Sequence, residues 1–360
     1  MLDLVAMEVN LPVSPETLKA VTALDHFRGL WAHGAGVPAE RLGRLREASS
    51  IQSVAASCRL AGIRVTDAEV AALLQGEAVP LQDGREILGY AEALQCPFPS
   101  PGEPVTVQGI QALHAMAAGI PGEPPPPTPW RTEPYHLEIF DAQGQAIGRV
   151  FQTLPPRLID EKMSELVEWH EDELQAARNH PILVISVFSL YFVAACPFPT
   201  GNGRVVHLLV QHLLDRAGYD YMPYASIERI LEEIRDEYFD ALDAAETKLW
   251  SGEADLEPWF AFFLGALEKH AEKIRSKIAL ERRALEFSPL QRKILETVRE
   301  HGTVGAGLLI EATGANRNTL KDNLRRMVDR GVLERFGERR GARYKLATGE
   351  GAPPVGPLEA

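Results

Sequence analysis

Apolar residues recur at helical spacing along most of this 360-residue chain, and the pattern predicts a mainly α-helical protein. In the N-terminal part the spacing is clearest over residues 21–31 and 54–60, with Ser49 and Ser50 as candidate caps of the second helix. The run 66–69, Thr-Asp-Ala-Glu, has the sequence of a capping box and predicts a short helix. Further helices are predicted over 107–118, on both sides of a break at 179–181, and over 205–214, 225–247 and 256–284.

Three segments of the middle region depart from this amphipathic pattern. Residues 182–195 are apolar almost all round, as expected of a helix buried at the centre of a bundle. Residues 135–140 and 147–151 are strand-like and lie on either side of Gly144, so they predict a short β-hairpin. The proline-rich segment 121–134 cannot continue a helix and is expected to form a surface loop.

The last part of the chain has the pattern of a small separate module. Ser288 and Pro289 are suited to begin a helix, and Gly302 is placed to end it. Helices are predicted over 289–301, 305–312 and 317–330, followed by strands over 332–336 and 342–346. Three short helices followed by a basic hairpin are typical of a winged helix-turn-helix.

These patterns give the expected domain organisation. The sequence contains no internal repeat, and its length predicts two or three domains. We expect an N-terminal helical region over 1–105, a core over 106–275, a connecting helix over 276–287, the winged helix-turn-helix over 288–346 and a disordered tail over 347–360.

Charge is distributed unevenly and sets the C-terminal module apart. The formal net charge of −13, taken alone, argues against nucleic acid as a partner. Between residues 316 and 345, however, ten Lys and Arg residues stand against four acids, a net +6 that leaves −19 for the rest. Such an asymmetry indicates a module with a partner of its own.

Cysteine usage and hydropathy indicate the compartment. Cys58, Cys96 and Cys196 form no CxxC or Cys/His cluster, so we expect neither a disulfide framework nor a metal site. No apolar stretch is long enough for a membrane span, and no signal peptide is expected. The sequence therefore predicts a cytoplasmic protein without a membrane partner.

Candidate chemistry lies in the segment 196–204, Cys-Pro-Phe-Pro-Thr-Gly-Asn-Gly-Arg, between two apolar helices. Gly201 and Gly203 allow the backbone N–H groups to turn to one side, and the next helix adds its free N–H groups and the positive end of its dipole. Arg204 falls in the first turn of that helix. These features predict an anion site suited to phosphate, with a tight inter-helix turn and an incidental arginine as the alternative.

The same segment resembles the signature loop of Fic-domain proteins, His-Pro-Phe-x-(Asp/Glu)-Gly-Asn-Gly-Arg-x-x-Arg. The shared core Pro-Phe-x-x-Gly-Asn-Gly-Arg is specific, and the resemblance extends over residues 15–275. It implies a Fic-type helical bundle in which the hairpin is a flap that aligns a protein target by strand addition. It also implies transfer of AMP from ATP to a protein hydroxyl, and a winged helix is a common companion.

Three positions depart from the family's pattern. Cys196 stands where the family has the His that acts as base, and Thr200 where it has the acid that holds magnesium. His207 stands where a second Arg grips the end of the triphosphate in the family, and it is expected to be only partly charged near neutral pH. A neutral Thr is a poor magnesium ligand, and a thiol titrates near about 8.5 unless its surroundings lower that value.

The resemblance thus implies a phosphate cradle that has lost its base and its metal carboxylate. Cys196 is the doubtful catalytic candidate, with an inert buried thiol as the alternative. ATP or another nucleotide is the expected ligand, and the role of magnesium stays open. The residues expected to contact the nucleotide are Thr200, Gly201, Asn202, Gly203, Arg204 and His207.

A second segment resembles the family's inhibitory helix, which has a Ser-x-x-x-Glu-Gly core. The matching stretch lies within residues 50–63 and reads Ser-Cys-Arg-Leu-Ala-Gly over 57–62. Ala61 replaces the Glu that pairs with the family's second Arg. Loss of both partners is consistent with a core that has no transfer activity left to restrain.

The predicted helix 317–330 is the candidate DNA-reading element. A recognition helix contacts base edges with its first residues, here Asn316, Arg317, Asn318 and Thr319. Phosphate contacts are expected from Lys321, Arg325 and the wing residues Arg339 and Arg340. The alternatives are a solvated basic surface and a helix-turn-helix that serves only for dimerisation.

Two functions follow from these expectations. The first is a DNA-binding regulator whose Fic core has lost transfer chemistry but still binds a nucleotide or a partner protein. Helix-turn-helix regulators usually pair, so a homodimer is expected with this function. The second is an active adenylyltransferase, or a related nucleotidyl or phosphoryl transferase, acting on a protein hydroxyl. The sequence leaves open whether the protein is an enzyme.

Overall fold

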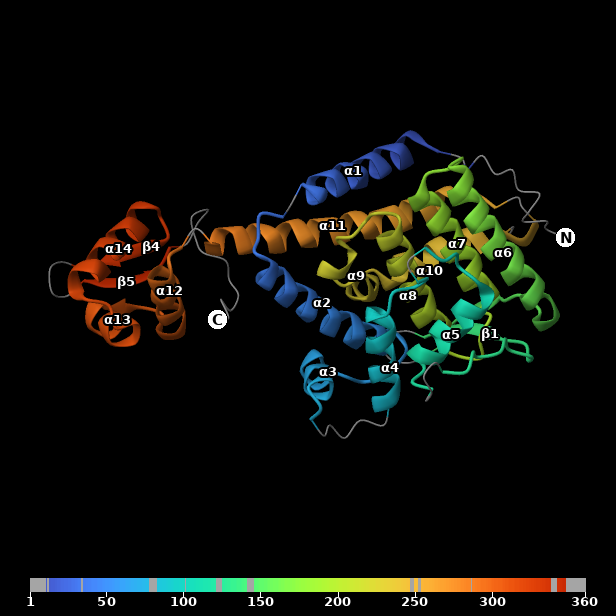
Figure 1. Ribbon diagram of the computed structural model, residues 1–360, viewed down its shortest axis with the longest axis horizontal. Helices are drawn as coiled ribbons and strands as arrows, with labels where there is room; N and C mark the ends of the chain where they lie inside the picture. The colour runs from blue at the N-terminus through green and yellow to red at the C-terminus, as the bar shows by residue number, and fades with distance from the viewer. Residues whose placement is uncertain are drawn as a thin grey trace. The chain divides into compact units, whose positions relative to one another are not determined.

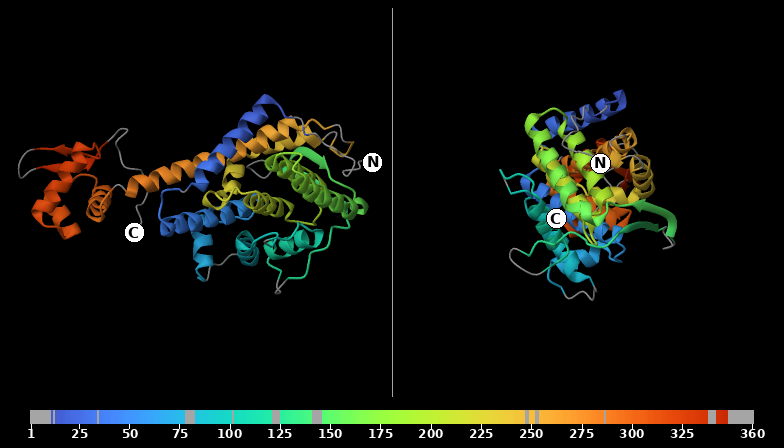
Figure 2. Two further views of the ribbon diagram at one scale, coloured as in Figure 1. Left: turned by 45° about the horizontal axis from the view of Figure 1, so that its top comes forward. Right: turned by 90° about the vertical axis from the view of Figure 1, so that its right-hand side faces the viewer.

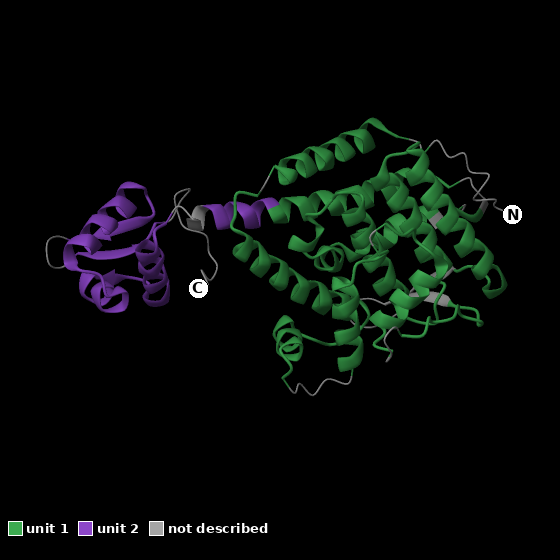
Figure 3. Ribbon diagram, in the orientation of Figure 1, with its two compact units in different colours: residues 1–274 green, residues 275–360 purple. Residues whose placement is uncertain are grey.

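The structure is a computed structural model, and the chain divides into two compact units, residues 1–274 and 275–360 (Figures 1 and 3). The boundary falls within one long helix, α11 (Glu257–Leu285). The described residues are 11, 13–33, 35–77, 83–100, 102–120, 125–140, 146–246, 249–251, 254–285, 287–337 and 342–347.

Unit 1 is built almost entirely of helices, as the apolar spacing predicts. Its N-terminal helices are α1 (Pro15–Ala32), α2 (Ala39–Leu60), α3 (Asp67–Leu74), α4 (Gly84–Gln95) and α5 (Val107–Ala117). After the hairpin follow α6 (Pro156–Ala176), α7 (Pro181–Ala195), α8 (Asn202–Arg216), α9 (Ile227–Glu233) and α10 (Arg235–Glu246). Two short 3₁₀ helices cover Met222–Tyr224 and Leu249–Ser251.

The capping box predicted before α3 is confirmed. The Thr66 hydroxyl accepts from the Glu69 N–H at 3.2 Å, and the Thr66 N–H donates to the Glu69 carboxylate at 2.8 Å. The predicted cap at Ser49 and Ser50 is wrong, because both lie inside α2, which begins after Pro38. The helix predicted over 225–247 is two helices, α9 and α10, and α4 is absent from the sequence-based expectation.

Helix α7 is the central element of unit 1, as its apolar sequence predicts. Every residue from Ile182 to Ala195 is buried, and α6 and α8 pack against it on either side (Figures 1 and 2). Burying one large side chain such as Phe188 or Phe192 contributes about 1.5–3 kcal/mol, so this helix gives the loop after it a rigid base. The start of the candidate site is therefore fixed by the core.

The hairpin consists of β1 (His136–Phe140) and β2 (Ala146–Gln152), paired antiparallel. His136 lies opposite Gln152 and Phe140 opposite Ala146, with a register shift between Glu138 and Phe140. The two strands form a sheet by themselves, so each has one backbone edge without a partner strand among the described residues. The predicted hairpin is thus present.

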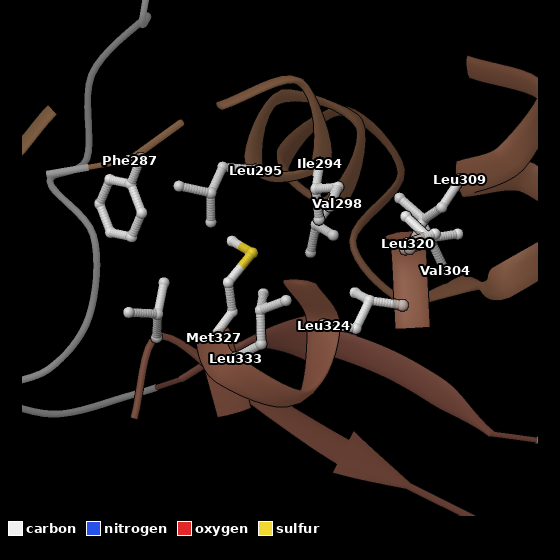
Figure 4. Packing of buried hydrophobic residues seen from close by; sticks show 11 residues of the cluster. Phe287, Ile294, Leu295, Val298, Val304, Leu309, Leu320, Leu324, Met327 and Leu333 are labelled. Carbon is white, nitrogen blue, oxygen red and sulfur yellow. The ribbon is translucent and has the colours of Figure 1, made fainter. Parts of the chain in front are cut away.

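Unit 2 contains three helices and a small sheet around one apolar core. The helices are α12 (Pro289–His301), α13 (Ala306–Thr313) and α14 (Arg317–Asp329), and the strands are β3 (Val304–Gly305), β4 (Leu333–Phe336) and β5 (Arg343–Leu346). The sheet is antiparallel in the order β3-β5-β4, and its two-residue strand β3 is not among the predicted elements. Ile294, Leu309, Leu324 and Met327 meet in the core, which Figure 4 shows.

Among the residues that the structure describes, no helix combines the length and the apolarity that a bilayer span requires.

Candidate functional site

The loop predicted to bind phosphate begins at Cys196, directly after α7. Cys196 adopts a left-handed conformation, with φ 44°, and its N–H donates to the carbonyls of Phe192 and Val193 at 3.2 Å. Its thiol is buried and donates to the Val193 carbonyl at 3.1 Å. The thiol hydrogen is therefore directed back onto α7.

Asn202 fixes the shape of the loop from inside. Its amide oxygen accepts from the N–H of Phe198, and its amide nitrogen donates to the carbonyl of Phe198, both at 2.9 Å. Phe198 is fully buried, and its ring stacks on His114 with ring centroids 3.9 Å apart. The Asn of the motif is thus a structural clamp whose amide is already occupied.

His114 of α5 supports the loop at Thr200. Its Nε2 lies 2.9 Å from the Thr200 carbonyl and its Nδ1 lies 3.0 Å from the Thr128 hydroxyl. A carbonyl can only accept, so this network assigns the hydrogen to Nε2. Burial lowers the pKa of His114, which keeps the ring neutral in that tautomer.

Arg131 joins the end of α7 to the base of the hairpin. Its guanidinium donates to the carbonyls of Cys196 at 2.6 Å, of Ala195 at 3.2 Å and of Glu133 at 2.8 Å, and also to Leu154. A cation at a helix C-terminus is favoured by the helix dipole and satisfies carbonyls that have no intrahelical partner. Sequence reasoning missed this residue, since most of its partners lie in two distant segments, 153–154 and 195–196.

Arg204 lies in the first turn of α8, and its side chain is buried. Its Nη1 lies 2.6 Å from the Glu86 carboxylate but off the line of an N–H bond, so the contact is an ion pair without an aligned hydrogen bond. Glu86 comes from α4, the helix that the sequence did not predict. Its Ile87, Tyr90 and Leu94 recur at helical spacing, and that signal identifies α4 in retrospect.

A cavity of about 390 Å³ brings the predicted nucleotide-contacting residues together, a size typical of small-molecule sites. The end of α2 supplies Ala61, and α9 and α10 supply Leu231 and Tyr238. The predicted residues on its wall are Cys196, Thr200, Gly201, Asn202, Gly203, Arg204 and His207. Sequence reasoning missed Tyr135, Leu231, Arg235, Tyr238 and Phe239 as wall residues.

His207 borders this cavity and also a much smaller apolar cavity between α7 and α10. Burial lowers the pKa of His207, which favours the neutral ring over the partly charged side chain that the sequence predicts. Its Nδ1 is buried and has no hydrogen-bond partner among the described residues. A neutral, unpaired imidazole therefore stands where the resemblance implies a second Arg.

Carboxylates are absent from two positions of the described cavity wall where the resemblance implies them. No Asp or Glu belongs to the described residues that line the cavity, and Thr200 offers only a neutral oxygen, so these residues do not fit a magnesium ion. Ala61, at the end of α2, places a methyl group on the cavity wall where the resemblance implies a Glu. The cavity thus has neither the metal ligand nor the inhibitory carboxylate.

In unit 2, α14 exposes the residues predicted to read DNA. Arg317, Asn318, Thr319, Lys321 and Arg325 are all exposed, while Leu320, Leu324 and Met327 on the opposite face are buried. Asn316 instead caps the helix, with its side-chain oxygen accepting from the Thr319 N–H at 2.9 Å, so it is held at the helix start and is not free for a base. Arg339 and Arg340 lie outside the described residues.

Comparisons with known proteins agree with this geometry. Residues 104–214 match the model of the Fic/DOC family. The whole chain is similar to the crystal structure of a Fic family protein from Desulfovibrio desulfuricans, with a TM-score of 0.59 and 21% identity over 94% of this chain and 98% of that one.

Two further solved structures share the fold. A Fic domain containing signaling protein from Bacteroides thetaiotaomicron matches with a TM-score of 0.55 and 21% identity, over 75% of this chain and 96% of that one. Fic-1 from C. elegans matches with a TM-score of 0.57 and 19% identity, over 73% of each chain. The predicted mainly helical Fic fold is therefore confirmed.

Proposed function

We propose that the protein is a DNA-binding regulator whose Fic core binds a nucleotide but no longer transfers AMP. Unit 2 is a winged helix-turn-helix in this proposal, with α14 as its recognition helix. The observation that carries it is the division of α14 into two faces. One face builds the core of the unit, and the other presents Arg317, Asn318, Lys321 and Arg325 to solvent.

The basic side chains of that face are available for an anionic partner. Among the described residues neither Arg317 nor Lys321 has a carboxylate within ion-pair distance. Arg325 lies 3.8 Å from Asp329, but both side chains are largely exposed, and such a surface pair contributes little. Phosphates would therefore displace few existing interactions of α14.

The Fic core supports a binding role better than a catalytic one. The phosphate loop is held by Asn202, His114 and Arg131 without any ligand. At the position of the family's base, however, the Cys196 thiol is buried and donates to the Val193 carbonyl. A general base must reach the hydroxyl that it deprotonates, and this thiol is directed elsewhere.

Two partners belong to the same proposal. The unpaired backbone edges of β1 and β2 suit a protein segment that adds as a further strand. A second copy of the chain would place two α14 helices on adjacent half-sites of a duplex, as helix-turn-helix dimers do.

The proposal is tested by the fluorescence anisotropy of a labelled duplex titrated with the full chain over a series of salt concentrations. Lys321→Ala should weaken binding and reduce the salt slope by about 1, because one phosphate contact is lost. Lys293→Ala, which removes the same charge from the exposed surface of α12, is the matched control and should bind like wild type. Equal binding by wild type and Lys321→Ala at every salt concentration would refute the assignment of α14.

A further inference from the structure

We infer that the cavity of the Fic core takes a nucleoside phosphate without magnesium, and that Arg235 of α10 supplies positive charge for its phosphate. This inference rests on the proposed nucleotide binding and specifies that the nucleotide is bound free of metal. Two observations carry it, namely the absence of an acid from the part of the cavity wall that the structure describes and the position of Arg235.

The first observation is the donor set of the cavity. Cys196, Thr200 and His207 are the candidate metal donors on its described wall, and none of them is a carboxylate. Glu86 contacts a residue of this wall, but its carboxylate is already paired with Arg204 and it does not itself line the cavity. Magnesium is held in proteins through carboxylates and substrate phosphates, so the wall offers it no anchor.

The second observation is that the charge of Arg235 is not neutralised by the protein. Arg235 lines the cavity, and the described residues place no carboxylate within ion-pair distance of it. Its guanidinium lies 5.6 Å above the ring of Phe239, another wall residue, which holds it beside the cavity. Arg235 is the first residue of α10, a position where the helix dipole disfavours a cation.

Arg204 and Arg235 contribute to phosphate binding in different ways. Arg204 is buried and compensated by Glu86, so it orients a phosphate at the start of α8 but adds little net charge. Arg235 adds the uncompensated charge, and its planar fork matches two phosphate oxygens. Together they replace the charge that magnesium would otherwise bring to the phosphates.

Other residues that line the cavity suit the uncharged part of such a ligand. His207 is neutral, and its buried Nδ1 has no partner within the described residues. Val193, Leu231 and Tyr238 complete an apolar and aromatic surface next to it. A heteroaromatic base that stacks on this surface fits there better than a terminal phosphate does.

The test is isothermal titration of the full-length protein with ADP, once in buffer with magnesium and once in EDTA. We expect equal affinity in the two buffers to within about twofold, because no protein group holds the metal. Arg235→Ala should weaken ADP binding by about tenfold in EDTA, and Arg235→Lys by less, since lysine keeps the charge but not the fork.

The controls separate binding from folding. Arg229→Ala removes a half-exposed arginine of α9 that does not line the cavity, and it should bind ADP like wild type. All three variants should keep the wild-type thermal midpoint. Thr200→Asp, a change at an exposed position on the cavity wall, should make ADP binding depend on magnesium.

The possible failures are distinguishable. ADP binding to wild type only in the presence of magnesium, or equal affinity for wild type and Arg235→Ala, would overturn the inference and leave the proposed nucleotide site intact. No binding of ADP, AMP or ATP in either buffer would overturn both the inference and the proposed role of the core.

Discussion

The amide of Asn202 forms a reciprocal pair with the backbone of Phe198, through an N–H···Oδ1 bond and an Nδ2–H···O bond, both 2.9 Å long. The four groups are buried, so no solvent replaces a missing partner. The loop between α7 and α8 consequently keeps its shape without a ligand.

Asn202→Ala should therefore destabilise unit 1 by about 2 kcal/mol or more, because two buried backbone groups lose their partners. Urea unfolding followed by tryptophan fluorescence measures this effect, since all five tryptophans of the chain precede residue 275. Asn202→Asp keeps the acceptor and loses the donor, so it should fall between wild type and Asn202→Ala. A wild-type midpoint for Asn202→Ala would mean that the clamp contributes nothing to stability.

The two glycines of the loop should respond differently to substitution by alanine. Gly201 has φ 75°, and a Cβ there would lie 3.3 Å from Nε2 of His114, so Gly201→Ala should cost about 1–2 kcal/mol of stability. A Cβ at Gly203 meets no atom within 4 Å and extends into open space on the cavity wall.

Gly203→Ala should thus leave the unfolding midpoint unchanged or slightly raised, since alanine favours the helix. It should weaken nucleotide binding by filling space that the phosphate needs. Parallel urea unfolding and ADP titration of both variants separate the two effects. Unimpaired binding by Gly203→Ala would place the phosphate elsewhere in the cavity.

Unit 1 should lose stability as the pH falls from 7.5 to 5.5. Burial lowers the pKa of His114, His207 and His212, whereas the unfolded chain takes up protons on these residues below the ordinary value of 6.5. The stability contributed by the neutral rings is complete above that pH and decreases below it. The Glu171 pKa of about 2 affects stability only at still lower pH, below the ordinary Glu value of 4.5.

Urea midpoints at the two pH values measure this dependence. His212→Gln removes one titrating group and can still donate to the Ala93 carbonyl, which Nε2 of His212 contacts at 3.0 Å. The variant should show a smaller change in midpoint than wild type does. Identical midpoints of wild type at pH 7.5 and 5.5 would contradict the assignment of neutral buried rings.

Two of the three departures from the family motif, at Cys196 and Thr200, should account for the proposed loss of transfer. Wild-type protein incubated with Mg-ATP should show no gain in intact mass, because Cys196 and Thr200 provide neither an accessible base nor a metal carboxylate. The double variant Cys196→His with Thr200→Asp restores the motif residues and should gain the mass of AMP. A nucleotide mass on wild type would make the chain an enzyme and remove the proposed loss of activity.

The elements with strong local signals could be predicted from the sequence. The capping box at Thr66 and Glu69, the apolar helix α7 and the helices of unit 2 are set by contacts within about one turn or by apolar periodicity. Two-residue strands such as β3 carry no such periodicity. The start of α2 was placed too late because its first residues are mostly exposed and charged, which hides the apolar spacing.

The candidate site could be predicted only where its residues are consecutive. Residues 196–207 form one motif, and the predicted site residues within it line one cavity. Other features of the site depend on segments that are far apart in the sequence. They are the ion pair of Glu86 with Arg204, the hydrogen bonds from Arg131 to the end of α7, and the position of Arg235 on the cavity wall. Such contacts arise from tertiary packing, and a single sequence carries no signal for them.

DNA recognition by α14 is tested most directly by selecting duplexes from a random pool with the full-length chain. We expect a defined sequence to be enriched, and we expect Asn318→Ala to relax the preference at one base pair, because Asn318 lies exposed in the first turn of α14. The role of α14 as a DNA-reading helix would be contradicted if the selection enriched no sequence. It would also be contradicted if Asn318→Ala selected the same sequence as wild type with the same preference at every base pair.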